Sequence, residues 1–216
     1  PNVREVISVD INQNAITKLN KQIKERKLRK IKAIQSNLFE NISSHFNLII
    51  FNPPYLPQDP GIDDQAIYGG KKGWEISERF FRNVSKHLFS DGIILFLFSS
   101  LTNQEKIDKF INNNLLQSKL LATEKLSFEE LYVYEITKLP LLRKLENKTL
   151  TNLHFFAQGK RGVIYKGILE KSKLIKTHFS KKEELIVAVK ATRKDSQAIG
   201  RIANEIRWLK KLNKRN

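Results

Sequence analysis

The sequence predicts an α/β protein in which a mostly parallel β-sheet is followed by a smaller domain with an antiparallel sheet and one helix. Up to residue 138, short apolar runs alternate with segments of helical apolar spacing, the pattern of a parallel sheet covered by helices. Beyond that point, three β-rich runs precede one amphipathic segment. Most of the formal net charge of +17 also lies there, so we expect two domains, residues 1–138 and 139–216.

The first domain begins with a buried strand that ends at Asp10. A helix follows it, because apolar residues from Ala15 to Ile23 recur three to four positions apart. The expected strands of this domain are residues 3–9, 31–35, 46–51, 92–99, 120–126 and 131–137, and the expected helices are 14–27, 74–88 and 104–115. In the second domain we expect strands at 154–156, 163–169 and 185–190 and a helix at 196–212.

The composition excludes several classes of protein. Apolar runs such as Ile93 to Phe98 are far shorter than the roughly 20 residues needed to cross a bilayer, so we expect no membrane contact. The sequence opens without a signal-peptide pattern and has no cysteine, which makes the cytoplasm the expected compartment. It begins with Pro1 and contains no methionine, so we expect a fragment of a longer protein.

The basic charge has two interpretations. A strongly positive net charge is typical of proteins that bind RNA or a membrane surface. A composition rich in Lys, Ile and Asn, with solvated lysines, explains the same charge, and we favour that explanation. Any RNA contact is expected through residues 139–216 and without sequence specificity, because lysines contact phosphates without reading bases.

Asp10 follows the first strand, where two roles are open to it. An acidic residue at the carboxyl end of such a strand can accept both ribose hydroxyls of a nucleotide cofactor. Aspartate at the same place also commonly caps the helix that follows. The residue by itself does not decide between a cofactor site and a cap.

The segment Asn52-Pro53-Pro54-Tyr55 comes directly after an all-apolar strand. Prolines lack N–H donors, and the residue before a proline is held extended. Asn52 can then present its side-chain oxygen beside the Pro53 carbonyl, giving two acceptors for the two hydrogens of one NH₂ group, while Tyr55 offers a stacking face. We predict methylation of a planar nitrogen by positioning. The alternative is a proline-stiffened turn that only ends the strand.

Five stretches carry a family resemblance: Ile7 to Asp10, Asn37-Leu38-Phe39, Phe46 to Pro57, Gly69 to Glu75 and Phe98 to Leu101. Together they resemble the HemK/PrmC release-factor glutamine methyltransferases, especially the archaeal and eukaryotic branch, over residues 1–138. The resemblance implies the Rossmann-like class I methyltransferase fold, S-adenosylmethionine (SAM) as cofactor, and a glutamine in a Gly-Gly-Gln loop of a translation release factor as substrate. It also implies a small zinc-ribbon activator protein as partner, and no metal site in this chain.

The resemblance implies a role for each matching position. Asp10 with Ile11 would bind the cofactor ribose, Asn37 and Leu38 would lie near its adenine, and Asn52 to Tyr55 would hold the target amide, with Asn52 also beside the cofactor. The family commonly has Asp where Asn37 stands, and Asn still offers an acceptor to the adenine amino group. The first strand and the Gly-rich cofactor loop of the family would lie before Pro1, so we expect this chain to lack them.

A second motif stands in the basic domain. Ala157 to Gly167, with glycines at Gly159 and Gly162, resembles the glycine-rich loop of protein kinases. Lys190 in Val187 to Lys190 is similar to the kinase phosphate-binding lysine, and Glu205 would be its glutamate partner. The resemblance implies a partial kinase amino-terminal lobe with weak ATP binding, because no segment resembles the kinase catalytic loop or its magnesium-binding motif. A small basic β-sheet module is the alternative.

Three functions therefore compete: a protein-glutamine methyltransferase, an adenine N6 methyltransferase acting on nucleic acid, and a non-catalytic fragment that binds RNA or protein. The Asn52 to Tyr55 motif does not separate the first two, because both targets present a planar NH₂ group. The residues after the motif favour a protein substrate, and no large insertion resembles a target-recognition domain for DNA.

Overall fold

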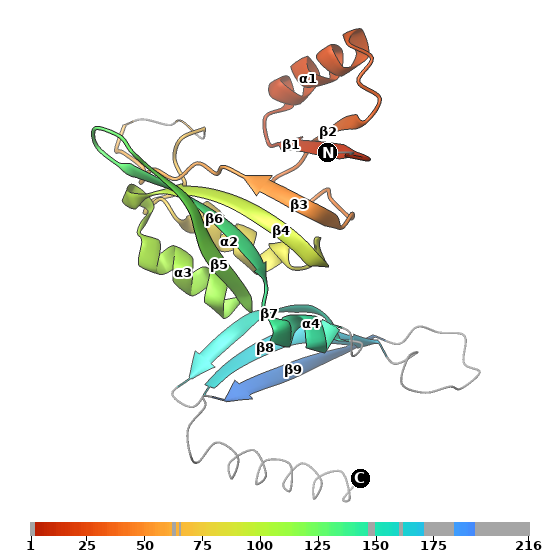
Figure 1. Cartoon of the computed structure of the whole chain (residues 1–216), viewed down its shortest axis with the longest axis vertical. Coiled ribbons are helices and arrows are strands. Elements are labelled where there is room, and N and C mark those ends of the chain that lie inside the picture. The colour runs from red at the N-terminus through yellow and green to blue at the C-terminus, as the bar shows by residue number, and fades with distance from the viewer. Residues whose placement is uncertain are drawn as a thin grey trace, which may run out of the picture. The chain divides into compact units, whose positions relative to one another are not determined.

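The computed structural model describes residues 3–61, 64, 66–146, 150–159, 162–170 and 184–192. The chain divides into two compact units, Pro1–Arg143 and Lys144–Asn216 (Figure 1). The predicted boundary after residue 138 lies just before α4 (Pro140–Glu146), the helix in which the units divide.

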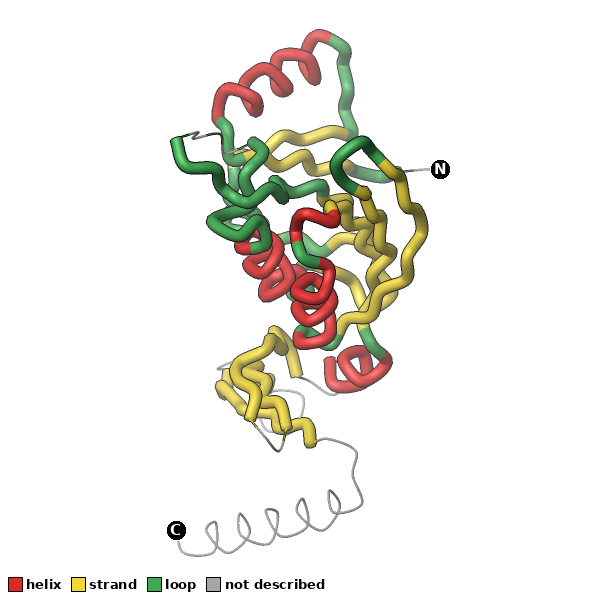
Figure 2. The backbone as a smooth tube through the Cα atoms, turned by 90° about the vertical axis from the view of Figure 1, so that its left-hand side faces the viewer, coloured by secondary structure: helices red, strands yellow, loops and turns green. Residues whose placement is uncertain are grey.

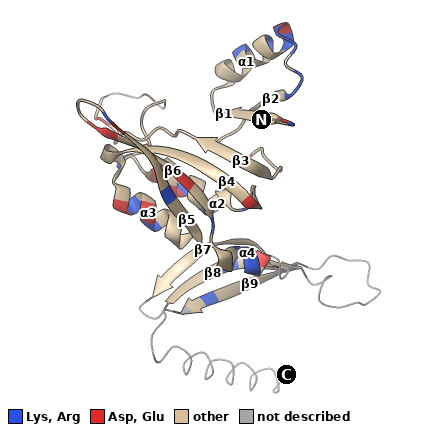
Figure 3. Ribbon diagram, viewed as in Figure 1, with Lys and Arg blue, Asp and Glu red and all other residues tan. Residues whose placement is uncertain are grey.

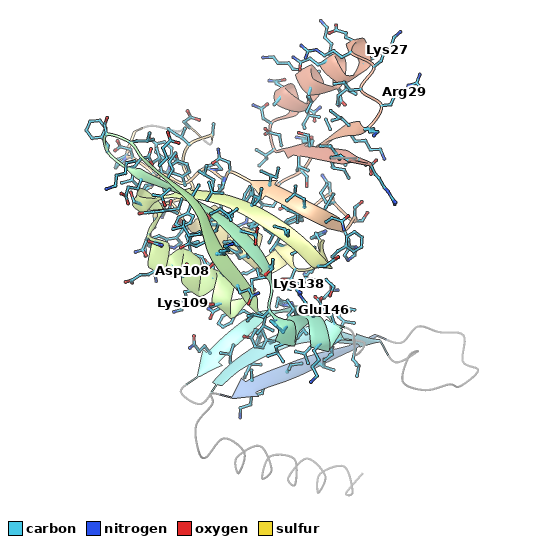
Figure 4. All side chains as sticks on the ribbon, viewed as in Figure 1. Lys27, Arg29, Asp108, Lys109, Lys138 and Glu146 are labelled. Carbon is cyan, nitrogen blue, oxygen red and sulfur yellow. The ribbon has the colours of Figure 1, made fainter. Side chains whose placement is uncertain are left out.

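The first unit opens with a β-α-β element, β1 (Val6–Asp10), α1 (Gln13–Glu25) and β2 (Ile31–Gln35). β1 and β2 pair in parallel. The Asn12 side chain caps α1 by accepting the backbone N–H groups of Asn14 and Ala15. Lys18, Lys21 and Lys24 of α1 are exposed (Figure 3), and the chain leaves the helix through a turn that contains Lys27 and Arg29 (Figure 4).

A four-stranded sheet forms the centre of the first unit, with the strand order β3-β4-β6-β5. Its strands are β3 (Phe46–Phe51), β4 (Leu88–Ser99), β5 (Leu116–Lys125) and β6 (Glu130–Lys138). The helices of this part are α2 (Glu75–Val84) and α3 (Gln104–Asn113), with the short 3₁₀ helix η1 (Ser100–Thr102) between β4 and α3. α2 and α3 run beside the sheet (Figure 2).

The predicted parallel arrangement is confirmed in part, because within the described four-stranded sheet β6 is the strand that runs against the others. β1–β2 and β3–β4 are parallel, but β4–β6 and β5–β6 are antiparallel, so the strands form a separate pair and a mixed sheet. The predicted turn between the last two strands requires this, because only antiparallel strands are joined by a short hairpin. The helix expected at 74–88 ends at Val84, since Leu88 already pairs with Phe46 as the first residue of β4.

The core of the first unit is an aromatic cluster centred on Phe80 of α2, which is 2% exposed. The Phe80 ring stacks on Phe51 of β3 at 4.3 Å and on Phe39, after β2, at 5.6 Å between ring centroids. Its edge meets Phe81, and Phe96 of β4 lies 6.1 Å away. One side chain thus packs against segments from both sheets.

His87 packs against the same cluster from the turn between α2 and β4. Its ring stacks on Phe39 at 4.4 Å, and its Nδ1 lies 3.2 Å from the Ser44 carbonyl oxygen. Burial lowers the pKa of His87, and the Ser44 carbonyl opposes that shift only in part. The neutral imidazole is therefore the form that fits this position.

The second unit contains a three-stranded antiparallel sheet in the order β7-β8-β9. Its strands are β7 (Leu150–Gly159), β8 (Gly162–Glu170) and β9 (Glu184–Thr192). The antiparallel sheet predicted for this domain is confirmed, with longer strands than the sequence indicated. The helix predicted at 196–212 lies outside the described residues.

In the part of the chain that the structure describes, every helix is too short or too polar to cross a membrane.

Phe80→Ala is expected to lower the free energy of unfolding by about 3–5 kcal/mol, because a large buried ring leaves a cavity that its neighbours fill incompletely. Phe128→Ala is the matched control, since Phe128 is 92% exposed and its loss changes little. Urea denaturation of both variants measures the difference. Equal stabilities would contradict the central place of Phe80.

The free energy of unfolding is expected to decrease as the pH falls below the ordinary pKa of histidine. The folded state lowers the pKa of His87, so the unfolded chain binds the proton first. The stability contributed by neutral His87 is present above the unfolded pKa of about 6.5 and is lost as the pH falls through the lower folded value. His87→Phe keeps the stacking but removes the titration, so thermal unfolding between pH 7.5 and pH 5 should show a weaker pH dependence in this variant.

Candidate active site

The loop Asn52–Tyr55 leaves β3 directly after Phe51. Asn52 is exposed, Pro53 is buried and Tyr55 is half-buried. Pro53 and Pro54 have no N–H groups, so the loop presents backbone carbonyls beside an exposed side-chain amide. The exposure of Asn52 and the lack of N–H groups in the prolines are therefore compatible with the predicted pair of acceptors, the Asn52 side-chain oxygen and the Pro53 carbonyl.

A second segment fixes this loop from one side. Leu56 donates its N–H to the Ile67 carbonyl at 3.0 Å and accepts the Gly69 N–H at 2.9 Å, and Gln58 donates to Gly70 at 3.0 Å. These bonds make a short parallel bridge between Leu56 and Tyr68. The chain after the motif is thus held by backbone hydrogen bonds, which do not depend on side-chain identity.

Two glycines let the loop lie this close. A Cβ atom at position 69 would lie 2.6 Å from the Pro54 carbonyl oxygen and would also strike the Gly73 carbonyl. A Cβ atom at position 73 would lie 2.5 Å from the Tyr55 carbonyl oxygen, and Gly73 has a φ of +84°. Only glycine fits either position without moving the motif.

The turn after β4 holds the loop from another side. The Thr102 hydroxyl donates to the Tyr55 carbonyl at 3.3 Å and accepts the Ser99 N–H at 3.3 Å. The Ser99 hydroxyl accepts the Leu101 N–H at 3.1 Å and donates to a carboxylate oxygen of Glu129. A chain of hydrogen bonds therefore joins Tyr55 to the start of β6.

Burial raises the pKa of Tyr55, and the nearby negative charge of Glu129 adds to this shift. The phenol therefore stays protonated at neutral pH, so its hydroxyl is a hydrogen-bond donor there.

Asp10 and Asn37 are brought together at the ends of β1 and β2. Ser36 donates its N–H to the Asp10 carbonyl at 3.0 Å, and the Gln35 side chain donates to Ile11 at 3.3 Å. The Asp10 carboxylate accepts the Asn12 N–H at 2.8 Å. Because Asn12 is the residue that caps α1, the alternative of Asp10 as the helix cap is wrong.

Asn37 and Leu38 begin the loop after β2. Asn37 donates its side-chain N–H to Glu40 at 3.0 Å, and Leu38 has a φ of +54°. A left-handed leucine is unusual and marks a backbone held by its surroundings. Phe39 follows and stacks on Phe80, as Phe51 does just before the motif, so this core links the two loops.

Sequence reasoning gave no role to Ser99, Thr102 or Glu129. Ser99 is the last residue of β4, which pairs in parallel with β3. Polar residues at the ends of neighbouring parallel strands lie at the same edge of a sheet, so the position of Ser99 could have indicated that it lies near the motif after β3. The contact with Glu129 has no signal in the sequence. It depends on the register of the β5–β6 hairpin.

In the second unit the structure places Gly159 and Gly162 opposite each other at the end of the β7–β8 hairpin. Gly159 has open space around the position of a Cβ atom, so no close backbone approach requires glycine there. Lys190 lies on β9 opposite Ile164 of β8. Glu205 lies outside the described residues, so a lysine–glutamate pair and the kinase resemblance stay predictions.

Residues 1–127 match the protein family described as Methyltransferase small domain. The chain belongs to this family. The reaction of this family is methyl transfer from SAM. The prediction of a methyltransferase, made from the Asn52 to Tyr55 motif, is confirmed at the level of the family. The match ends before β6, so the second unit lies outside it.

Named proteins are similar to the same part of the chain. A putative protein N5-glutamine methyltransferase of Methanocaldococcus jannaschii is 36% identical over 141 residues, which cover 63% of this chain and 71% of that protein. A release factor glutamine methyltransferase of Borreliella burgdorferi is 31% identical over 102 residues, 43% of this chain and 36% of that protein. The chain thus spans about a third of the bacterial relative's length.

One solved structure with a similar backbone is the E. cuniculi Mtq2-Trm112 complex, described as responsible for methylating the eRF1 termination factor. The TM-score is 0.44 at 20% identity, covering 63% of this chain and 87% of that one, which is too low to assign the fold by itself.

Gly69→Ala is expected to displace the Asn52–Tyr55 loop, because the new methyl group would overlap the Pro54 carbonyl. Amide NMR spectra should show shifts for Asn52, Tyr55, Leu56 and Gln58, together with destabilisation by about 1–3 kcal/mol. Gly159→Ala is the control, since that position is open. Unchanged loop resonances in Gly69→Ala would contradict the described clamp.

Proposed function

We propose that this chain is the catalytic part of a protein-glutamine methyltransferase that acts on the side-chain amide of a glutamine in a translation release factor. The observation that carries the proposal is the Asn52–Tyr55 loop, in which Asn52 is exposed directly after β3 while the Pro54 and Tyr55 carbonyls are held against Gly69, Gly73 and Thr102. The similarity to a putative protein N5-glutamine methyltransferase and to a release factor glutamine methyltransferase supports it.

An amide nitrogen is a weak nucleophile because its lone pair is delocalised, so orientation is what the site must supply. The Asn52 side-chain oxygen and the Pro53 carbonyl each accept one hydrogen of the target NH₂ group. Tyr55 is neutral at physiological pH, and burial raises its pKa further, so it stacks on the planar amide without adding charge. A neutral polar site of this kind stabilises positive charge developing on the nitrogen.

The cofactor in this proposal is SAM, which supplies the methyl group when it is bound. Asp10 fits the ribose, because its carboxylate is exposed after β1 and is not used as the helix cap. Asn37 and Leu38 fit the adenine side, because they begin the loop after β2, in which Leu38 has a left-handed backbone. Ile11, which is 54% exposed, flanks the same position.

The Gly-Gly-Gln loop as target, and a small zinc-ribbon activator protein as partner, are proposed on the family resemblance. Methylation of adenine N6 is the competing activity, because an adenine presents the same NH₂ group. The two are separated by offering both substrates to one preparation. We propose no catalytic role for the second unit, whose RNA contact and weak ATP binding stay predictions.

Asn52→Ala is expected to abolish methyl transfer while leaving SAM affinity within about twofold of wild type, because the side chain orients the acceptor and carries little cofactor binding. Transfer of radioactive methyl from SAM to a Gly-Gly-Gln release factor, beside calorimetric titration with SAM, measures both quantities.

Asn112→Ala is the matched control, because Asn112 is exposed on α3 and is not part of the loop. Full activity in Asn52→Ala would remove the proposed role. Methylation of an adenine-containing oligonucleotide in place of the release factor would replace the proposed substrate.

A further inference from the structure

Two buried hydroxyl groups lie in the turn between β4 and α3. Ser99 is the last residue of β4 and Thr102 is the last residue of η1, and both are fully buried. A hydroxyl has a single proton to donate, and a buried proton that finds no acceptor is costly. The acceptor that each hydroxyl reaches therefore shows what this turn holds in place.

The backbone fixes the direction in which the Thr102 hydroxyl donates. The Ser99 N–H donates to the Thr102 oxygen at 3.3 Å, and a backbone N–H can only be a donor. The Thr102 proton is therefore left for the Tyr55 carbonyl oxygen, which lies 3.3 Å away. Because Tyr55 comes 47 positions earlier in the chain, this bond joins the turn after β4 to the motif after β3.

The Ser99 hydroxyl has its direction fixed in the same way. The Leu101 N–H donates to the Ser99 oxygen at 3.1 Å, so the Ser99 proton is donated to the Glu129 carboxylate. A second bond lies beside this one, in which Glu130 donates its N–H to the Ser100 hydroxyl at 3.1 Å. The end of the β5–β6 hairpin thus holds the turn whose Thr102 hydroxyl holds the motif.

Glu129 is related to Tyr55 in a second way. Burial raises the pKa of the Tyr55 phenol, and the negative charge of Glu129 adds to that shift. A carboxylate with this effect lies near the phenol, and the same carboxylate is joined to the Tyr55 carbonyl through Ser99 and Thr102. The side chain and the backbone of Tyr55 are therefore both beside this group of residues.

We propose that Thr102 is a positioning residue for methyl transfer, because its hydroxyl orients the Tyr55 carbonyl and with it the Asn52–Tyr55 loop, while Ser99 and Glu129 hold Thr102 in place. The proposal rests on the proposed glutamine methyltransferase activity. Transfer to an amide nitrogen depends on alignment, and a displacement of about 1 Å can lower such a rate about a hundredfold. A loop fixed from a buried hydroxyl meets that requirement.

The competing role for these hydroxyls is purely structural. Ser99 and Thr102 form a capping box, in which each side chain accepts a backbone N–H of the short helix η1. A cap stabilises the turn without any bond to Tyr55. The two roles differ in what a substitution changes, since the loss of a cap lowers stability alone and the loss of a positioning group lowers kcat.

Thr102→Val tests the proposal, because it removes the hydroxyl and keeps the branched shape. We expect kcat for the release factor to fall at least about tenfold, with KM and SAM affinity within about twofold of wild type. Thr102→Ser keeps the hydroxyl and should recover most of the rate. The Leu56 amide belongs to the same peptide group as the Tyr55 carbonyl, so its NMR resonance should shift in Thr102→Val and stay near wild type in Thr102→Ser.

Ile111→Val is the control for lost stability, because Ile111 is 1% exposed on α3 and is not one of the hydrogen-bonded residues described above. Thermal unfolding measures how far each variant is destabilised. A fall in kcat for Thr102→Val that Ile111→Val matches at the same loss of stability would assign the hydroxyl to the cap alone.

Glu129 provides a second test that leaves the core untouched, because this residue is only half-buried. Glu129→Ala removes the acceptor of the Ser99 hydroxyl, whereas Glu129→Gln keeps one. We expect kcat to fall severalfold in Glu129→Ala and in Ser99→Ala, with no further fall in the double variant, because both changes remove the same bond. Glu129→Gln should stay within about twofold of wild type. Ser127→Ala, at an exposed position of the same hairpin, is the control.

The outcomes separate this proposal from the proposed function. Wild-type kcat in Thr102→Val, or an unchanged Leu56 resonance in that variant, overturns the positioning role while the proposed function stands. Equal losses in Glu129→Gln and Glu129→Ala overturn the part assigned to the Ser99 hydrogen bond. A wild-type enzyme that methylates no Gly-Gly-Gln protein overturns the proposed function and the positioning role with it.

Discussion

The stacking of Phe39 and Phe51 on Phe80 is the contact on which the first unit depends. In the described residues, β1 and β2 form one sheet and β3 to β6 another, and no ladder of hydrogen bonds joins them. Phe39 belongs to the loop after β2, and Phe51 is the last residue of β3. Burial of aromatic surface therefore holds the two sheets together, whereas backbone hydrogen bonds hold the strands together within each sheet. The same contacts fix the position of the loop after β2 relative to the loop after β3.

The chemistry of the site follows from backbone geometry more than from reactive side chains. In the proposed function Asn52 and the Pro53 carbonyl supply acceptors, while two glycines and a threonine hydroxyl lie against the Pro54 and Tyr55 carbonyls. Such a site needs little titratable machinery at the amide, because the reaction needs an aligned nucleophile. This fits a loop that is tied at several points along its length although the side chain proposed to orient the substrate amide is a single exposed asparagine.

Several strands and part of the candidate site can be predicted from the sequence. The strands at 31–35 and 46–51 are confirmed to the residue, because each is a short β-rich run with clear ends. The start of β4 was missed, since Gly92 looks like a strand terminus but lies inside the strand, packed against Leu88. Asn52 to Tyr55 were found as a local motif, whereas Ser99 and Glu129 were not, because they meet through a hydrogen bond between residues 30 positions apart. A local motif can be identified from one sequence, but the pairing register of the strands in a sheet cannot.

Gly69 and Gly73 also bear on how sites of this kind are recognised in other chains. A short run of asparagine, two prolines and an aromatic residue does not by itself show whether its carbonyls are held. The missing Cβ atoms are what allow the second segment to lie against Pro54 and Tyr55. A sequence that kept the prolines but filled either glycine would need a different loop. The spaced pair of glycines downstream is therefore a second criterion, beside the motif, for a loop held in this conformation.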